Sequence, residues 1–349
     1  MTPDERARAR LIRRVRQHSP ELARYISRAF NTIKEEVPLP LLERFLATGD
    51  IGGVLEEIFD QALFEKATAD IQKIYFGQFT DSLGHFGKDF AVTFGVLEPE
   101  IITAIQDLNG TLIQEFADSV REQVRSTVEE GLRQGINPRR MARSVRDDIG
   151  LGANQREWVN NLREELENNS RKALRRSLQR GYMRRPDGSL MYNPKHAGSF
   201  GVGKRDMELL ERTLGTDKKL TKQQVDRIVG QYEKKLMAWN SEAHARTAAL
   251  RANATAQHMA TEKAIKEGIL DGGRMISIWT TVGDSRVRPS HQATEDPNLG
   301  TVRFGEPFTT PDGWTGIIPA MSGWGCRCSK YDRYATKAEM EAMGMVGTV

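Results

Sequence analysis

Apolar residues recur every three or four positions along most of the chain, and this spacing predicts amphipathic helices that bury one face. The longest early series runs from Ile101 to Leu132 and predicts a helix over about 98–134. Asn137 followed by Pro138 is typical of a helix start, because Asn caps a helix and Pro fits its first turn. The first half of the chain is therefore expected to be a set of helices.

A second long helical tract is expected between residue 221 and about Gly268. Thr221 and Gln224 form the T-x-x-Q capping pattern, and the alanine-rich stretch that follows has a high helix propensity. A single helix over this tract would exceed about 60 Å, at about 1.5 Å per residue. We therefore expect either one long helix or a break near Trp239 to Ser241.

The period of the apolar positions changes after Gly268. Residues 275–281 combine β-branched and aromatic side chains without helical spacing, which predicts a strand. Two turn-rich motifs follow, P-D-G-W at 311–314 and G-W-G-C-R-C at 323–328. We therefore predict a mainly α fold, with an elongated helical body of long helices and a small C-terminal α+β domain.

The length of 349 residues is sufficient for two or three domains. Shifts in composition and periodicity suggest six segments, each with its own character. These are a basic N-terminal arm at 1–18, an N-terminal helical region at 19–135, a helical region with a basic stretch and a flexible loop at 136–220, a long helical segment at 221–270, the small α+β domain at 271–335, and a C-terminal tail at 336–349.

The net charge of +4 is too small to identify the whole chain as a nucleic-acid binder, so the local distribution of charge matters more. The arm at 1–18 and the stretch at 171–185 are both rich in arginine and poor in acids. Each is either a solvated surface or a surface that contacts nucleic acid or an acidic partner. In the second stretch the candidate contact residues are Arg171, Arg175, Arg176, Arg180, Arg184 and Arg185.

Composition argues against several protein classes. No window approaches the roughly 18 consecutive apolar residues of a membrane-spanning helix, and no apolar export signal stands at the N-terminus. We therefore expect neither a membrane protein nor a membrane partner. The two cysteines are too few for a disulfide framework and fit folding in a reducing cytoplasm.

Those two cysteines are candidate metal ligands. Cys326 and Cys328 stand at i and i+2, so on an extended segment their side chains point to the same face. With His291 from an earlier loop they would supply three of the four ligands that zinc prefers. Asp284 or water would complete the shell. His244 and His258 are instead expected to be surface or interface histidines, because neither belongs to an H-x-x-x-H pattern.

A hydrogen-bonded polar core is the alternative interpretation of the same region. A Cys-x-Cys pair is a less specific metal signal than paired Cys-x-x-Cys motifs. Asp284, Arg286 and Arg288 fit this alternative, since a bidentate contact between Arg and Asp can lock a loop to its neighbour. The sequence leaves both alternatives open.

The order of motifs in this region resembles the phage head morphogenesis family, the minor head proteins with a Mu F-like C-terminal domain. The resemblance rests on W-T-T-x-x-D-S-R-V-R-P-S-H at 279–291, a later Gly300, P-F at 307–308, P-D-G at 311–313, Pro319 and the final C-R-C. It extends over about 125–333, through E-G-L-R-Q-G-I-N-P-R-R-M and L-T-K-Q-Q-V-D-R-I-V-G-Q-Y. The chain departs from the family at Ala248, where Glu is usual, and at Gly325, where Asn is usual.

The resemblance implies a virion structural protein rather than an enzyme. Such a protein would be made in the host bacterial cytoplasm and would dock in several copies at the portal vertex inside the head. Its partners would be the portal protein, capsid or scaffold proteins and packaged double-stranded DNA, and its role would lie in head assembly, DNA packaging or ejection.

Two other functions remain as alternatives. The first is a phage nuclease or toxin-like enzyme that uses the C-terminal His/Arg/Cys cluster, but the P-loop and dinucleotide fingerprints are missing from the sequence. The second is a stand-alone DNA-binding protein, but no compact recognition motif is present.

Overall fold

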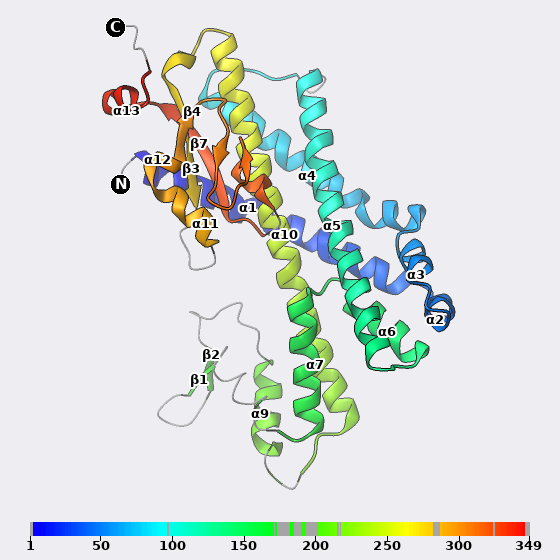
Figure 1. The fold of residues 1–349 in the computed structure, drawn as a ribbon. Helices are drawn as coiled ribbons and strands as arrows, with labels where there is room; N and C mark the ends of the chain where they lie inside the picture. The colour runs from blue at the N-terminus through cyan, green and yellow to red at the C-terminus, as the bar shows by residue number, and fades with distance from the viewer. Residues whose placement is uncertain are drawn as a thin grey trace. The chain divides into compact units, whose positions relative to one another are not determined.

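Helices dominate the fold, and strands occur in two places. The computed structural model describes residues 3–95, 98–170, 172, 182–184, 190–192, 202–214, 216, 218–281, 287–323 and 325–345 (Figure 1). Apart from a short hairpin, the strands gather in the C-terminal part of the chain. The predicted class is therefore confirmed: the protein is mainly α with a small C-terminal α+β region.

The helices before the C-terminal region include the long ones that the periodicity predicted. They are α1 (Pro3–Glu36), α2 (Leu39–Ala47), α3 (Ile51–Ile58), α4 (Gln61–Asp89), α5 (Pro99–Arg133), α6 (Pro138–Asp148), α7 (Ala153–Glu167), α9 (Lys204–Thr213) and α10 (Lys222–Lys266). The hairpin pairs β1 (Tyr182–Arg184) with β2 (Leu190–Tyr192) in antiparallel register.

The capping patterns act as the sequence predicted. The Asn137 side chain accepts a hydrogen bond from the Arg140 amide at 2.9 Å and starts α6. At the start of α10, the Gln224 amide donates to the Thr221 hydroxyl at 3.3 Å, and the Thr221 amide donates to the Gln224 side chain at 2.9 Å. The 45 residues of α10 continue without a break, so the tract is one long helix.

The chain folds into two compact units, and each is assembled from distant segments. The first comprises Met1–Ala29, Glu65–Asp118 and Glu242–Val349, and the second comprises Phe30–Phe64 and Ser119–Ser241. Because α1, α4, α5 and α10 contain residues of both units, neither unit is one continuous stretch of sequence.

The C-terminal α+β region belongs to the first unit. Its sheet has the order β4-β3-β7, and both pairs are antiparallel. The strand predicted at 275–281 is confirmed as β3 (Met275–Thr281). The remaining elements are η2 (Gly272–Arg274), α11 (Pro289–Gln292), η3 (Ala293–Glu295), α12 (Pro297–Gly300), β4 (Thr301–Arg303), β5 (Phe308–Thr309), β6 (Thr315–Gly316), η4 (Pro319–Ser322), β7 (Cys328–Tyr334) and α13 (Lys337–Ala342).

A buried polar cluster attaches this sheet to α10. The Lys330 amine has no exposed surface and lies 2.9 Å from Asp332 and 3.0 Å from Nδ1 of His258. Asp332 also accepts a hydrogen bond from Ser277 on β3 at 2.7 Å. Burial lowers the pKa of His258 to about 4, so this histidine is neutral at physiological pH and serves as an interface residue. His244, also on α10, is buried rather than on the surface.

The second unit has a tight turn between α6 and α7 at its centre. Gly150 has a φ of +88°, and a Cβ at this position would lie 2.9 Å from Phe30 and 3.0 Å from Met237. Its amide donates to Gln123 at 2.8 Å, and its carbonyl accepts from Asn240 at 3.1 Å. Only glycine combines this backbone angle with so close an approach.

Two half-buried carboxyl groups of the second unit lie near cations. Burial raises the pKa of Asp148 to about 6 and the pKa of Glu233 to about 7. Thr127 donates to Asp148 at 2.8 Å, and Lys34 partly offsets the burial of both carboxyls. The two groups therefore titrate close to neutral pH.

No helix in the described part of the chain has the length and apolar character needed to cross a bilayer.

The raised pKa values predict that stability falls as pH rises toward neutrality. Between about pH 4 and pH 7 the folded chain binds more protons than the unfolded chain. The free energy of unfolding therefore falls as pH rises through this range. Glu233→Gln keeps the neutral form, so the variant should melt above the wild type at pH 7.5, and the two should converge near pH 5. Thermal melts at both pH values measure this. The exposed Glu164→Gln of α7 is the control, and an equal rise in that variant would contradict the explanation.

Candidate metal centre

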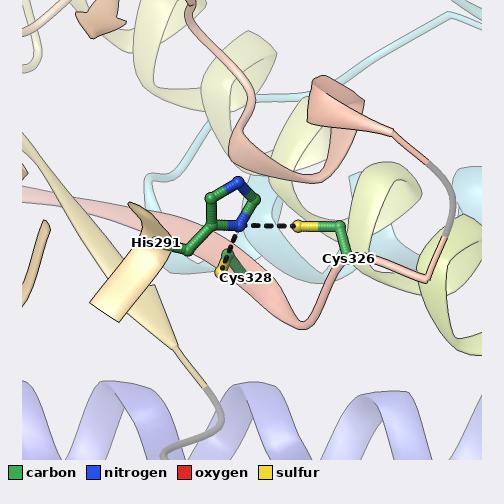
Figure 2. A group of neighbouring side chains, drawn as sticks. All are labelled: His291, Cys326 and Cys328. Atoms are coloured by element: carbon green, nitrogen blue, oxygen red, sulfur yellow. Dashed lines mark hydrogen bonds between the residues drawn. The ribbon is translucent and has the colours of Figure 1, made fainter. Parts of the chain in front are cut away.

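His291, Cys326 and Cys328 meet in the C-terminal α+β region (Figure 2). Nδ1 of His291 lies 3.7 Å from Sγ of Cys326 and 3.4 Å from Sγ of Cys328. The three ligand atoms all lie within 4.8 Å of one another. The exposed fractions are 1%, 2% and 0%, so the cluster is sealed from solvent. The structure thus brings together the three predicted ligands, and this group could hold a metal ion.

Local backbone features bring the three side chains together. Pro289 begins α11 and places His291 in its single turn. The Thr294 hydroxyl donates a hydrogen bond to the His291 carbonyl at 2.7 Å. The segment before β7 turns at Gly325, whose φ is +74°, so that Cys326 reaches the imidazole from a loop. Cys328 is the first residue of β7 and pairs with Thr281 of β3.

Aromatic rings surround the cluster. The Trp279 ring lies edge-on to His291, with centroids 5.3 Å apart, and to Phe308, at 5.5 Å. Trp279, Val287, Phe308 and the two cysteines form one buried apolar cluster. The candidate ligands therefore sit inside the hydrophobic core of the α+β region, where charge is costly unless it is compensated.

The two thiols influence each other strongly. A hydrogen bond from Cys328 lowers the pKa of Cys326, whereas the same contact and burial raise the pKa of Cys328. Such a pair holds one negative charge readily and a second one poorly. A cation between the sulfurs is the general way to relieve that repulsion, because metal ligation deprotonates thiols.

The distances fit a small tetrahedral metal ion. Zinc bonds of about 2.3 Å to sulfur and about 2.0–2.1 Å to nitrogen place N and S ligands about 3.5 Å apart at a tetrahedral angle. The two observed separations of 3.4 Å and 3.7 Å lie on either side of that value. In addition, the buried side chain of Trp279 acts on Cys328 through a hydrogen bond that favours the thiolate, so its indole N–H is placed to support a thiolate ligand there.

The other predicted site residues are placed less completely. Arg288 donates to the Ser322 carbonyl at 3.4 Å and so joins α11 to the η4 turn. Asp284 and Arg286, its expected companions, lie outside the described residues. Arg184 ends β1, whereas Arg171, Arg175, Arg176, Arg180 and Arg185 also lie outside them.

Sequence reasoning missed one ion pair next to this site, between a buried arginine and a half-buried carboxylate. Arg251 of α10 has an exposed fraction of 1% and binds both carboxylate oxygens of Glu115 on α5, at 2.6 Å and 2.7 Å. Its Nε donates to the Ala320 carbonyl of η4 at 2.8 Å. The preceding carbonyl, that of Pro319, accepts from Cys326 at 3.5 Å. Arg251 therefore connects the cysteine loop to two long helices.

A weak signal for this pair exists in the sequence. Arg251 stands in an alanine-rich stretch, where the small side chains allow other elements to pack closely on all sides of α10. A charged residue in such a stretch requires a partner. The partner could not be identified, because Glu115 is 136 positions away and resembles the other acids of α5.

Comparison with known proteins adds no assignment: no protein-family model, no curated protein and no solved structure matches this chain.

The Arg251 pair predicts an asymmetric effect of substitution on stability. Arg251→Met leaves Glu115 without its partner and the Ala320 carbonyl without its donor, so it should lower the free energy of unfolding by about 3 kcal/mol. The double variant Arg251→Met with Glu115→Leu should recover a large part of the loss, because no charge remains buried alone. Urea denaturation of the two variants and the wild type measures the difference. A double variant less stable than the single one would contradict this account.

Proposed function

We propose that the protein is a structural component of a bacteriophage head that docks at the portal vertex inside the capsid and assists head assembly, DNA packaging or ejection. The observation that carries the proposal is the convergence of the residues behind the family resemblance. Trp279, His291 and Phe308 are separated by up to 29 positions, and they meet the C-R-C cysteines in a single buried cluster. The residues of the motif therefore belong to one folded unit, as expected of a structural domain.

The burial of the cluster supports a structural role over a catalytic one. A hydrolase or nuclease needs an open site in which acid and base groups reach the substrate. Here the imidazole and both sulfurs are sealed in the core. A cavity of about 410 Å³ lies elsewhere and is lined by residues of α1, α4, α10, β3 and β7. The ligand cluster is thus better suited to holding the fold than to turning over a substrate.

Long helices supply the surfaces that the proposed partners would contact. Helices such as α4 and α5 present extended exposed faces of the kind that portal, capsid and scaffold proteins bind through side-by-side packing. Packaged double-stranded DNA is the fourth proposed partner, because exposed arginines are concentrated on particular segments. We further propose several copies per particle, in keeping with the symmetry of a portal ring.

We also propose that the metal is zinc. Two thiolates and one imidazole form a soft donor set of the type that zinc prefers, and water or Asp284 would be the fourth ligand. The bound ion would compensate the thiolate charge inside the core. In this role His291 would secure α11 to the start of β7, and the indole N–H of Trp279 would orient the Cys328 sulfur.

The head-protein proposal is tested by locating the chain in phage particles. Purified mature particles should contain it in several copies, measured by quantitative mass spectrometry, and imaging should place its density at one vertex. It should also co-purify with the portal protein of the same phage. Full recovery of the chain in the lysate, together with its absence from DNA-filled particles, would overturn the proposal.

The zinc proposal is tested by metal analysis of the purified chain. The wild type should contain about one zinc ion per chain after expression with added zinc, and His291→Ala should contain almost none. The exposed His85→Ala of α4 is the matched control and should retain zinc. Cobalt substitution should produce thiolate-to-cobalt absorption in the wild type but not in His291→Ala. Zinc that survives in His291→Ala, or that is missing from the wild type, would refute the assignment.

A further inference from the structure

The outward face of α1 carries a stripe of arginines. Their spacing follows the helical repeat, so they share one side of the helix, and all of them are exposed. Over 22 residues the stripe extends about 33 Å, at about 1.5 Å per residue. We call this set the arginine stripe: Arg6, Arg10, Arg13, Arg16, Arg24 and Arg28.

The opposite face of α1 fixes the helix within the first unit. Val15, Leu22 and Ile26 on that face have exposed fractions of 6%, 0% and 1%. Val15 packs against Leu250 of α10 and Ala320 of η4. The arginine stripe is therefore presented by a helix that is packed against the first unit. The sequence alone suggested only a basic arm at 1–18.

Polar contacts reinforce this attachment. Arg14, which lies between the two faces, donates to Asn253 of α10 at 3.0 Å and to Ser82 of α4 at 3.3 Å. Gln78 of α4 donates to the His18 carbonyl at 2.9 Å. Arg14 is thus occupied in holding the helix, and we do not count it in the arginine stripe.

The charge of the arginine stripe is compensated only in small part. Within the described part of the chain, none of its six arginines forms an ion pair with a carboxylate, and Arg28 lies over the Tyr25 ring at 5.1 Å. Gln17, Pro20 and the exposed acid Glu21 fill the positions between the two halves of the stripe. Six cations against one acid leave this face strongly positive, so it attracts a polyanion.

We infer that the arginine stripe binds the phosphate backbone of duplex DNA without reading its sequence. Arginine offers a planar fork of donors that matches phosphate oxygens. The length of about 33 Å is close to one turn of B-DNA, about 34–36 Å. The inference deepens the proposed function, on which it rests for the choice of packaged duplex as the polyanion.

An acidic protein surface is a poorer match for the same face. Protein interfaces are organised around buried apolar or aromatic anchors within a polar rim. The outward face of α1 between Arg6 and Arg28 offers small or polar residues such as Ala9 and Gln17, together with the acid Glu21, and no large apolar side chain between its arginines. Backbone phosphates require no apolar anchor, because counterion release supplies most of the binding free energy.

The test uses the full-length chain and a fluorescent 30-base-pair duplex, with binding followed by anisotropy at several salt concentrations. The variant Arg10→Gln with Arg13→Gln should bind at least tenfold more weakly at low salt. Its slope of log K against log[salt] should be smaller by about 1.8, because two phosphate contacts are lost. The variant Arg10→Lys with Arg13→Lys keeps both charges and should keep most of that slope.

The control removes the same charge from another exposed helix. Arg139→Gln with Arg143→Gln on α6 should leave affinity and slope close to the wild type. Equal losses in both pairs would show a simple net-charge effect and overturn the inference. Unchanged binding in the α1 variant would also overturn it, as would equal competition by polyglutamate, which would indicate an acidic protein partner. Circular dichroism melts confirm that each variant is folded.

The same variants distinguish this inference from the proposed function. In one outcome, particles still contain the Arg10→Gln, Arg13→Gln chain, and the purified variant binds duplex as well as the wild type. This outcome refutes only the inference about the arginine stripe. A chain that binds duplex through the arginine stripe but is absent from particles refutes the head-protein role and leaves the DNA surface intact.

Discussion

Sealing two thiols and an imidazole inside an apolar core is the constraint on which the C-terminal region depends. Each side chain comes from a different part of the fold, namely α11, the loop before β7 and the first residue of β7. None can separate from the others without opening the aromatic cluster around Trp279. The three side chains and the aromatic cluster therefore form one packed unit, and this group could hold a metal ion.

The long helix α10 connects the C-terminal region to the rest of the first unit. Its alanine-rich part is buried, with Ala245, Ala252 and Ala260 each at 0–1% exposure, so neighbouring elements approach its backbone closely. Polar residues among these alanines make the specific connections. Arg251 reaches both Glu115 and the η4 turn, and His258 contacts the buried Lys330 of β7. Small residues provide space, and a few charged groups determine the alignment.

These features suit a protein that is assembled and then kept in place. Its buried polar groups connect elements of the fold, and the candidate ligand cluster is closed to substrates. The exposed arginines of the stripe on α1 differ, because in the described part of the chain they form no ion pair with a carboxylate. In a head protein at the portal vertex, the first property would maintain the shape through assembly, and the second would face the packaged polyanion.

Much of the local structure follows from residues close together in the sequence. The bounds of β3, the start of α6 at Asn137 and the start of α10 at Thr221 were predictable because strand propensity and capping act over a few residues. The candidate ligand trio was also predicted, chiefly because the chain has only two cysteines and they stand two positions apart.

Tertiary structure alone decided the pairing of Arg251 with Glu115, the burial of His244 and the attachment of α1 through its buried face from Val15 onward. These outcomes depend on which distant surfaces meet. The local sequence around Glu115 does not indicate that Arg251, 136 positions away, is its partner. The sequence by itself therefore determined the elements and their chemistry, whereas the choice among many equivalent long-range contacts required the packed structure, because packing is a property of the whole chain at once.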